Sequence, residues 1–243
     1  MTLSSAEKSL HHTERADISL IFVTGDTHGD ITRFKDPKLR KLKKNDSLII
    51  CGDFGFVWNG SKQEQAALKK LSSLKYNILF VDGCHENFNV LDKLEAREWN
   101  GGKVHFIAHN IIHLMRGQVY TIDNKKIFTM GGGKSQDIDI RCEAGTWYEH
   151  EIPSSGEINE GIRNLAENDN CVDYIISHEP PAFIKNCFSE YPMERLEVDK
   201  FFENVIENCK FKGWYFGKCH VNRIIPQNFY SLFDYIINPE QIS

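Results

Sequence analysis

Five short polar segments each follow directly after a strand-like apolar run, and no other feature of this chain constrains its fold as strongly. In chain order they are GDTHGD (residues 25–30), GDFG (52–55), GCHE (83–86), SHEPP (177–181) and GKCH (217–220). Open α/β sheets bind ligands at the carboxyl ends of their strands. Carboxylates and imidazoles that collect at such an edge predict a metal site, because both are common ligands of divalent metals.

The first hundred residues alternate between strand and helix patterns. Strands are predicted at 18–23, 48–51 and 78–81, and helices at 31–44, 61–74 (capped by Ser61) and 86–95. This alternation predicts a parallel sheet covered by helices.

From residue 103 the pattern changes to short strands separated by turn-like residues. Strands at 103–107, 111–116, 118–122 and 126–130 predict an antiparallel meander, and residues 131–155 a long functional loop. Helices near 156–168 and 194–209 and strands at 172–177, 213–217, 221–225 and 229–237 complete the chain. We predict one α/β domain over residues 18–243 with two sheets facing each other, after a flexible lead-in at residues 1–17.

Charge and cysteine content narrow the class of protein. The formal net charge of −5 argues against sequence-independent binding of nucleic acid, which needs a positive surface. Seven irregularly spaced cysteines suit reduced thiols better than a disulfide framework. No segment offers the roughly 20 apolar residues of a membrane span. We expect a soluble, cytoplasmic protein with no membrane partner, and the sequence does not predict its oligomeric state.

The first three polar segments carry the chemistry most directly. Asp26 and His28 are two residues apart, so both side chains can reach one ion at a tight turn, and Asp53 has two oxygens that can bridge two ions. Mixed oxygen and nitrogen ligands suit Mn²⁺, Fe²⁺ or Zn²⁺. Sites that hold two such metal ions side by side commonly catalyse the hydrolysis of phosphate esters. His85 lies one residue past a ligand position, where it can either protonate the leaving oxygen or stabilise the transition state.

These motifs resemble the pattern of the calcineurin-like metallophosphoesterases, which is D-x-H, G-D, G-N-H-[DE], a lone His and G-H-x-H, over residues 18–237. The resemblance implies a four-layered α/β-β/α sandwich of two mixed sheets with a dinuclear centre. The first metal's implied ligands are Asp26, His28, Asp53 and His220. A second metal would share Asp53 and take His178 with residues 84 and 218, and His85 would be the catalytic histidine.

Two residues depart from the family pattern, and both fall on the second metal. Cys84 stands where the family has Asn, and Lys218 where it has His. Cys84 is either a thiolate ligand that favours Zn²⁺ or Fe²⁺, or a small buried residue. Lys218 cannot bind a cation while protonated, so we expect its ammonium in or near the second metal's place, holding a phosphate oxygen.

The long loop resembles that of a subgroup of bacterial and phage members of the family. Its Lys134 and Arg141 are predicted to bind substrate phosphate, with a solvated loop as the alternative interpretation.

The primary hypothesis is a metal-dependent phosphoesterase that hydrolyses a phosphomonoester or phosphodiester by attack of metal-bound hydroxide. Its cofactor is one or two divalent ions, Mn²⁺, Fe²⁺ or Zn²⁺, and Cys84 and Lys218 raise the question of reduced activity. The alternative is a weakened or inactive homologue that binds a phosphorylated ligand as a regulatory module. A nucleotide, an RNA end, a phosphoprotein and a small phosphoester all remain open as partners.

Overall fold

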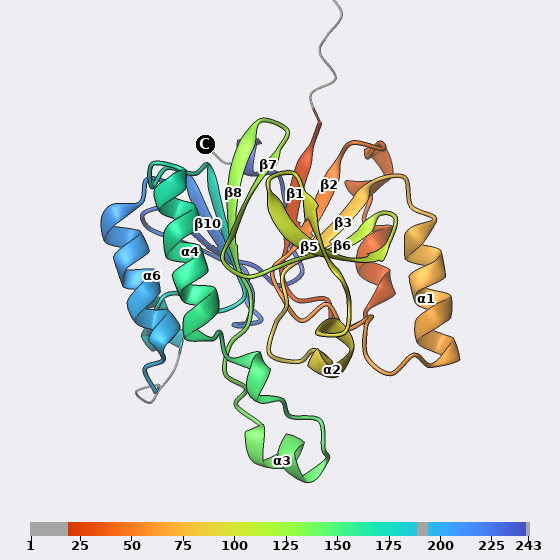
Figure 1. Cartoon of the computed structure of the whole chain (residues 1–243). Coiled ribbons are helices and arrows are strands. Elements are labelled where there is room, and N and C mark those ends of the chain that lie inside the picture. The colour runs from red at the N-terminus through yellow and green to blue at the C-terminus, as the bar shows by residue number, and fades with distance from the viewer. Residues whose placement is uncertain (1–18, 189–193, 242–243) are drawn as a thin grey trace, which may run out of the picture.

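The computed structural model describes residues 19–188 and 194–241. Two β-sheets face each other at its centre (Figure 1). The lead-in predicted for residues 1–17 lies outside the described residues, and the extent of the domain stays a prediction. Within the described residues, no helix combines the length and apolar character that crossing a bilayer requires.

The first sheet has seven strands. In spatial order they are β13 (Ile236–Ile237), β1 (Ile21–Thr24), β2 (Ser47–Ile50), β3 (Asn77–Phe80), β6 (Ile111–Leu114), β5 (Gly102–Ala108) and β4 (Ala96–Trp99). Strands β1, β2, β3 and β6 pair in parallel, and the outer strands pair antiparallel. The sheet is therefore mixed.

The second sheet has six strands and a similar plan. In spatial order they are β11 (Arg223–Ile225), β12 (Phe229–Ser231), β10 (Gly213–Phe216), β9 (Tyr174–Ser177), β8 (Lys125–Met130) and β7 (Gln118–Ile122). The middle strands β12, β10, β9 and β8 are parallel, and β11 and β7 are antiparallel edges.

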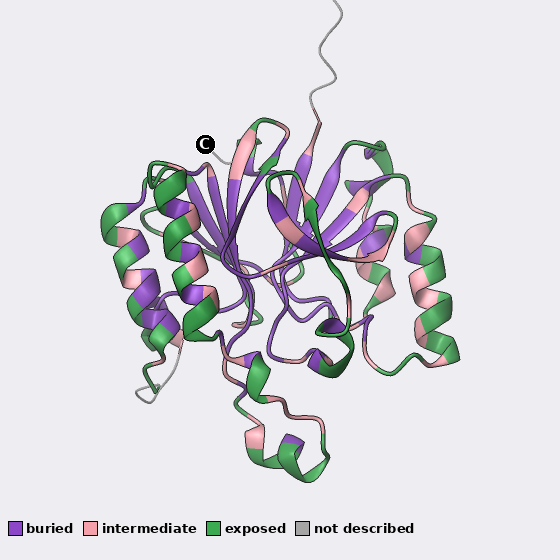
Figure 2. Ribbon diagram, in the orientation of Figure 1, coloured by how far each residue is buried: buried purple, intermediate pink, exposed green. Residues whose placement is uncertain are grey.

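Apolar side chains of both sheets meet in a central core, in which Ile49 and Leu79 of the first sheet join Ile176 and Tyr215 of the second. Helices cover the outer faces, and their outward sides are exposed (Figure 2). The first sheet carries α1 (Lys62–Ser72), η1 (Ile31–Lys35) and η2 (Leu39–Lys41); the second carries α4 (Ser155–Glu167), α5 (Ala182–Phe188) and α6 (Glu197–Asn208). The predicted four-layered α/β-β/α sandwich of two mixed sheets is confirmed.

Several predicted helices are shorter than expected. The predicted helix over 31–44 is wrong, because two 3-10 helices, η1 and η2, stand in its place. Asp36, which precedes Pro37, has ψ 134°, as expected where a proline disfavours helix in the residue before it. The predicted helix over 86–95 contracts to α2 (Phe88–Leu91), and β4 was not predicted. Ser61 does cap α1, since its side chain accepts from the Glu64 amide.

The predicted meander is also wrong. Strands β5 and β6 form a hairpin in the first sheet, whereas β7 and β8 form a hairpin in the second. The chain crosses between the sheets at Gly117, which has φ 70°. The final strand likewise splits into β12 and β13, which belong to different sheets.

The segment predicted as a loop over 131–155 contains two short helices, α3 (Ile138–Glu143) and η3 (Glu149–Glu151). In Figure 1 this segment extends below the sheets as a protruding arm. The α5 helix, which follows Pro181, was not predicted, and η4 (Pro239–Gln241) ends the described chain.

Candidate metal centre

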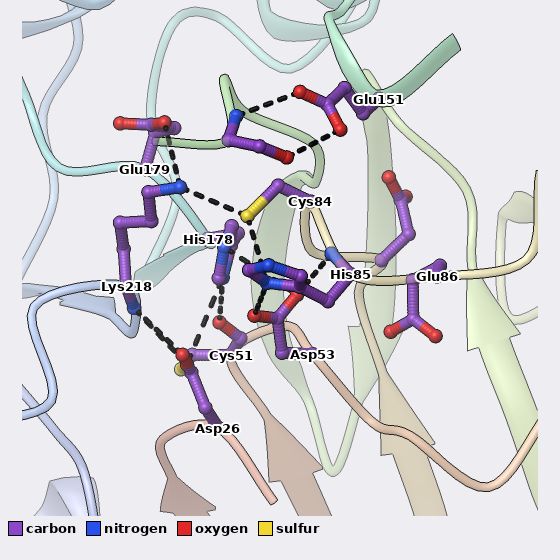
Figure 3. A network of polar contacts seen from close by, with 12 residues as sticks. Asp26, Cys51, Asp53, Cys84, His85, Glu86, Glu151, His178, Glu179 and Lys218 are labelled. Carbon is purple, nitrogen blue, oxygen red and sulfur yellow. Dashed lines mark hydrogen bonds and ion pairs between the residues drawn. The ribbon is translucent and has the colours of Figure 1, made fainter. Parts of the chain in front are cut away.

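The five polar segments meet at the carboxyl ends of β1, β2, β3, β9 and β10. The parallel pairing of β1, β2 and β3 aligns the first three ends, and that of β9 and β10 aligns the last two. Because the sheets face each other, Asp26 and Asp53 from one sheet lie close to His178 and Lys218 from the other (Figure 3). The five segments therefore lie at one edge of the two sheets, as their order along the chain predicts.

The first donor group consists of four side chains whose ligand atoms all lie within 4.8 Å of one another, namely Asp26, His28, Asp53 and His220. The two imidazole Nε2 atoms of His28 and His220 are 3.0 Å apart, and His220 Nε2 is 3.0 Å from an Asp26 oxygen. Both aspartates are buried, whereas the side chains of His28 and His220 are 39% and 50% exposed. Solvent and substrate can thus reach this group from the histidine side.

The backbone of this edge is held in an uncommon conformation. Four of its non-glycine residues are left-handed: His28 (φ 45°), Asp53 (φ 43°), Lys218 (φ 64°) and His220 (φ 50°). Such residues cost free energy and cluster at functional sites.

Two glycines let the segments approach each other. A Cβ atom at Gly83 would lie 1.9 Å from Asp53 Oδ1, and one at Gly217 would lie 1.9 Å from Asp26 Oδ1. Any side chain at either position would displace a carboxylate of the first donor group.

The second donor group is Asp53, Cys84 and His178, all three buried, with ligand atoms again within 4.8 Å of one another. His178 Nδ1 lies 3.1 Å from the Cys51 carbonyl, so it donates there and leaves Nε2 as the free ligand atom. Nε2 is buried without a hydrogen-bond partner in the described part of the chain, 3.8 Å from Asp53 Oδ1. In the neutral ring this nitrogen can bind a cation beside Asp53, and in the protonated ring it carries an N–H that faces the Asp53 carboxylate.

Lys218 reaches into this second group (Figure 3). Its Nζ donates to Cys84 Sγ at 2.9 Å and to the Lys134 carbonyl at 2.8 Å, and lies 3.8 Å from Glu179. Burial opposes the positive charge, but the neighbouring Cys84 and Glu179 outweigh it and raise the pKa of Lys218 above its usual value. One member of the donor set that would hold a second ion, Cys84, is therefore already in contact with an ammonium.

His85 bridges two acids. Its Nδ1 is 2.9 Å from Asp53 Oδ2, its Nε2 is 3.2 Å from Asp137 Oδ1, and its amide donates to Asp53 Oδ1 at 2.8 Å. The hydrogen bond to Asp53 and the neighbouring Cys84 raise the pKa of His85 to about 11. The side chain is 37% exposed, so this protonated imidazole faces both the donor groups and solvent.

Sequence reasoning missed Asp137, which contacts His85. It lies on the segment that lacked periodicity, and only the expectation of a functional loop pointed to that region.

Electrostatics couple the buried groups. Burial opposes ionisation of Asp53, but His178 and His85 hold the pKa of its carboxyl well below the usual range. The same aspartate, with Asp26, overcomes burial and raises the pKa of His178 to about 10. Burial and Asp53 raise the pKa of the Cys84 thiol, but the adjacent His178 and His85 have the larger opposite effect. The pKa of this thiol is therefore lowered to about 7.

Arg141 is buried beneath the second group. Its guanidinium pairs with Glu151 at 2.9 Å and donates to the carbonyl of Cys84 at 2.8 Å and to that of Thr146 at 2.6 Å. These contacts fix the Cys84 backbone and do not favour the predicted contact between Arg141 and substrate phosphate. Lys134 is different, because its side chain is 36% exposed and pairs with Glu194 at the rim.

Two of the cavities in the described part of the chain can be compared with the site. The larger, about 620 Å³, is lined by residues such as Phe88, His105 and Arg116 and by none of the predicted site residues. The smaller, about 320 Å³, includes Lys134 and Glu179 in its lining and therefore adjoins the contacts of Lys218. We favour the smaller cavity as the neighbour of the chemistry, because Lys134 and Glu179 of its lining both lie against the Lys218 ammonium.

The chemistry of the two groups gives different answers about metal binding. The first fits a divalent transition metal, because the ligand atoms of two carboxylates and two imidazoles converge within 4.8 Å of one another. The second has three suitable donors but also a cation in contact with one of them.

Comparison with known proteins adds the following. The sequence profile described as calcineurin-like phosphoesterase matches residues 19–208. No curated protein matches the chain. Among solved structures, the crystal structure of phosphopantetheinyl hydrolase from Mycobacterium tuberculosis has a TM-score of 0.40 and 14% sequence identity, over 92% of this chain and 91% of that chain.

Proposed function

Because this chain belongs to the calcineurin-like phosphoesterase family, we propose that it is a metal-dependent hydrolase of a phosphomonoester or phosphodiester. The single observation that carries the proposal is the convergence of Asp26, His28, Asp53 and His220 within 4.8 Å. A divalent ion held there, Mn²⁺, Fe²⁺ or Zn²⁺, would polarise a phosphoryl oxygen and lower the pKa of water.

The chain's own residues supply the remaining functions. His85 is the proposed general acid, since its raised pKa keeps it protonated at neutral pH and its Nε2 faces outward to Asp137. Asp53 orients His85 through Nδ1, so the Nε2 proton is the one available to a leaving oxygen.

Substrate phosphate would meet a positive rim. Lys218 lies beside Cys84, and Lys134 lies on the wall of the 320 Å³ cavity, so both are proposed phosphate contacts. The leaving group would extend along that cavity. A nucleotide, an RNA end, a phosphoprotein and a small phosphoester all present the phosphate that these contacts recognise.

A second candidate function rests on the contact between Lys218 and Cys84. If the altered second group no longer supports turnover, the protein would bind a phosphorylated ligand without hydrolysing it. This version keeps the first donor group and the fold.

Turnover of bis-p-nitrophenyl phosphate and p-nitrophenyl phosphate tests the proposal. Protein stripped with a chelator and reloaded with Mn²⁺, Fe²⁺ or Zn²⁺ should hydrolyse at least one of them, and Asp26→Asn should lose the activity. The Asp169→Asn variant is a matched control, because Asp169 is exposed at the end of α4. Absence of turnover with every metal, together with thermal stabilisation by inorganic phosphate, would favour the binding function instead.

A further inference from the structure

The second donor group already contains a positive charge. We propose that this protein binds one divalent ion, at the first donor group, and that the ammonium of Lys218 takes the place of a second ion. The part that concerns phosphate rests on the proposed function, whereas the ion count does not.

Contact geometry excludes simultaneous binding at the second group. Lys218 Nζ lies 2.9 Å from Cys84 Sγ, which is one of the three donors there. An ion bound by that sulfur would lie directly against the ammonium, in a region where Cys84 is fully buried and the Lys218 side chain is 13% exposed. Two like charges repel strongly at such a distance when water does not screen them.

Lys218 is also anchored in this position. Its amide donates to the Asp26 carboxylate at 3.1 Å, and its Nζ donates to the Lys134 carbonyl at 2.8 Å. The side chain cannot swing into solvent without losing the bonds of its Nζ to the Lys134 carbonyl and to Cys84.

A buried acid balances the ammonium from behind. Glu179 directly follows His178, is 2% exposed, and has an oxygen 3.8 Å from Lys218 Nζ. The same carboxylate accepts from the Lys134 amide at 3.0 Å and pairs with Lys185 at 2.9 Å, so it is rigidly placed. Buried charges are retained where they are paired, and this pairing makes the second group a site for a lysine.

The arrangement leaves one donor for substrate. A lysine ammonium has three N–H groups, and Cys84 and the Lys134 carbonyl account for two of them. The third is available to a phosphate oxygen that sits between the bound ion and Cys84. Lys218 would thereby neutralise phosphate charge as a second ion does, as a fixed point charge.

Metal content of the purified protein tests the inference. After chelation and saturation with Mn²⁺, elemental analysis should give about one ion per wild-type chain, and electron paramagnetic resonance should show isolated rather than spin-coupled Mn²⁺. Lys218→His, which removes the charge and adds a ligand, should raise the count to about two. Lys212→Met, at an exposed lysine that pairs with Asp173, should leave it at one.

The possible outcomes separate the two proposals. Two ions per wild-type chain would overturn the single-ion inference and leave the proposed hydrolase intact. A count that stays at one in Lys218→His would also contradict it. No bound ion at all in wild type would contradict both. Because the wild-type measurement decides the question alone, a failure of Lys218→His to fold does not rescue the inference.

Discussion

The two donor groups share Asp53 but are completed in opposite ways. The first adds a second carboxylate and two half-exposed histidines, and these four side chains surround a position open to solvent. The second adds a buried thiol and a buried imidazole, and an ammonium contacts the thiol. The contact of Lys218 with Cys84 is thus the feature that most clearly separates the two groups.

The supports of the two groups differ as well. Asp26 and Asp53 follow buried strands of the first sheet directly, so the sheet itself positions them. The Cys84 backbone depends in addition on Arg141, which reaches it from the protruding arm and is held there by Glu151. The first group is built by strand ends of both sheets, and the second partly by the arm.

The largest expected effect comes from the shared residue. Asp53→Asn removes charge from both groups, and we expect loss of ion binding and a fall in kcat/KM of more than about 1,000-fold, because metal catalysis supplies several kcal/mol. Calorimetric titration with Mn²⁺ and the nitrophenyl ester assay measure both. Asp169→Asn is the control. If Asp53→Asn kept full ion affinity, Asp53 would not be a ligand shared by the two donor groups.

The support of the second group comes next. Glu151→Ala leaves the guanidinium of Arg141 buried and unpaired, which should cost about 3 kcal/mol of unfolding free energy. For a chain of this size that lowers Tm by about 6–12 °C. Glu149→Ala, an exposed residue of the same 3-10 helix, should change Tm little. Calorimetry that shows equal Tm values for the two variants would contradict the assignment of the arm as a support.

His85 separates catalysis from ion binding. His85→Asn should lower kcat about 100-fold, because general acid catalysis contributes at least that much, while the ion count stays at one. His109→Asn is the matched control at an exposed histidine in the turn between β5 and β6. If His85→Asn lost the ion instead, His85 would belong to the ligands and not to the acid chemistry.

The smallest expected effect concerns Asp137. This carboxylate is 41% exposed and 3.2 Å from His85 Nε2, so Asp137→Asn should change kcat by about fivefold or less. The pH–rate profile should shift to lower pH on its alkaline side, because a negative partner of the imidazolium has been removed. Glu143→Gln, at an exposed residue of the same arm, should leave the profile unchanged.

The common edge of the two sheets was predictable from the sequence because it depends on local order: each ligand directly follows an apolar run. The four layers were predicted from the family resemblance. The crossing at Gly117 was not predictable, since four short strands with turns between them are equally consistent with one sheet or two. Pairing partners depend on the whole chain, and alternation within a strand does not name them.

Within the site, the first donor group was predicted in full, whereas the environments of Arg141 and Asp137 were not. Their positions depend on how the arm folds back, and the arm has no periodic pattern to read. Arg141 carries the charge expected of a residue that binds phosphate. Its guanidinium instead pairs with the buried carboxylate of Glu151, ten residues away in the sequence.

The left-handed backbone at His28, Asp53 and His220 has a practical consequence for protein engineering. Glycine is the residue that relaxes such a conformation, yet glycine carries no ligand atom. Directed evolution toward heat tolerance will therefore find no useful substitutions at these three positions. Increases in thermal stability must come from the outer helices, and every active variant will keep the strained backbone at the strand ends.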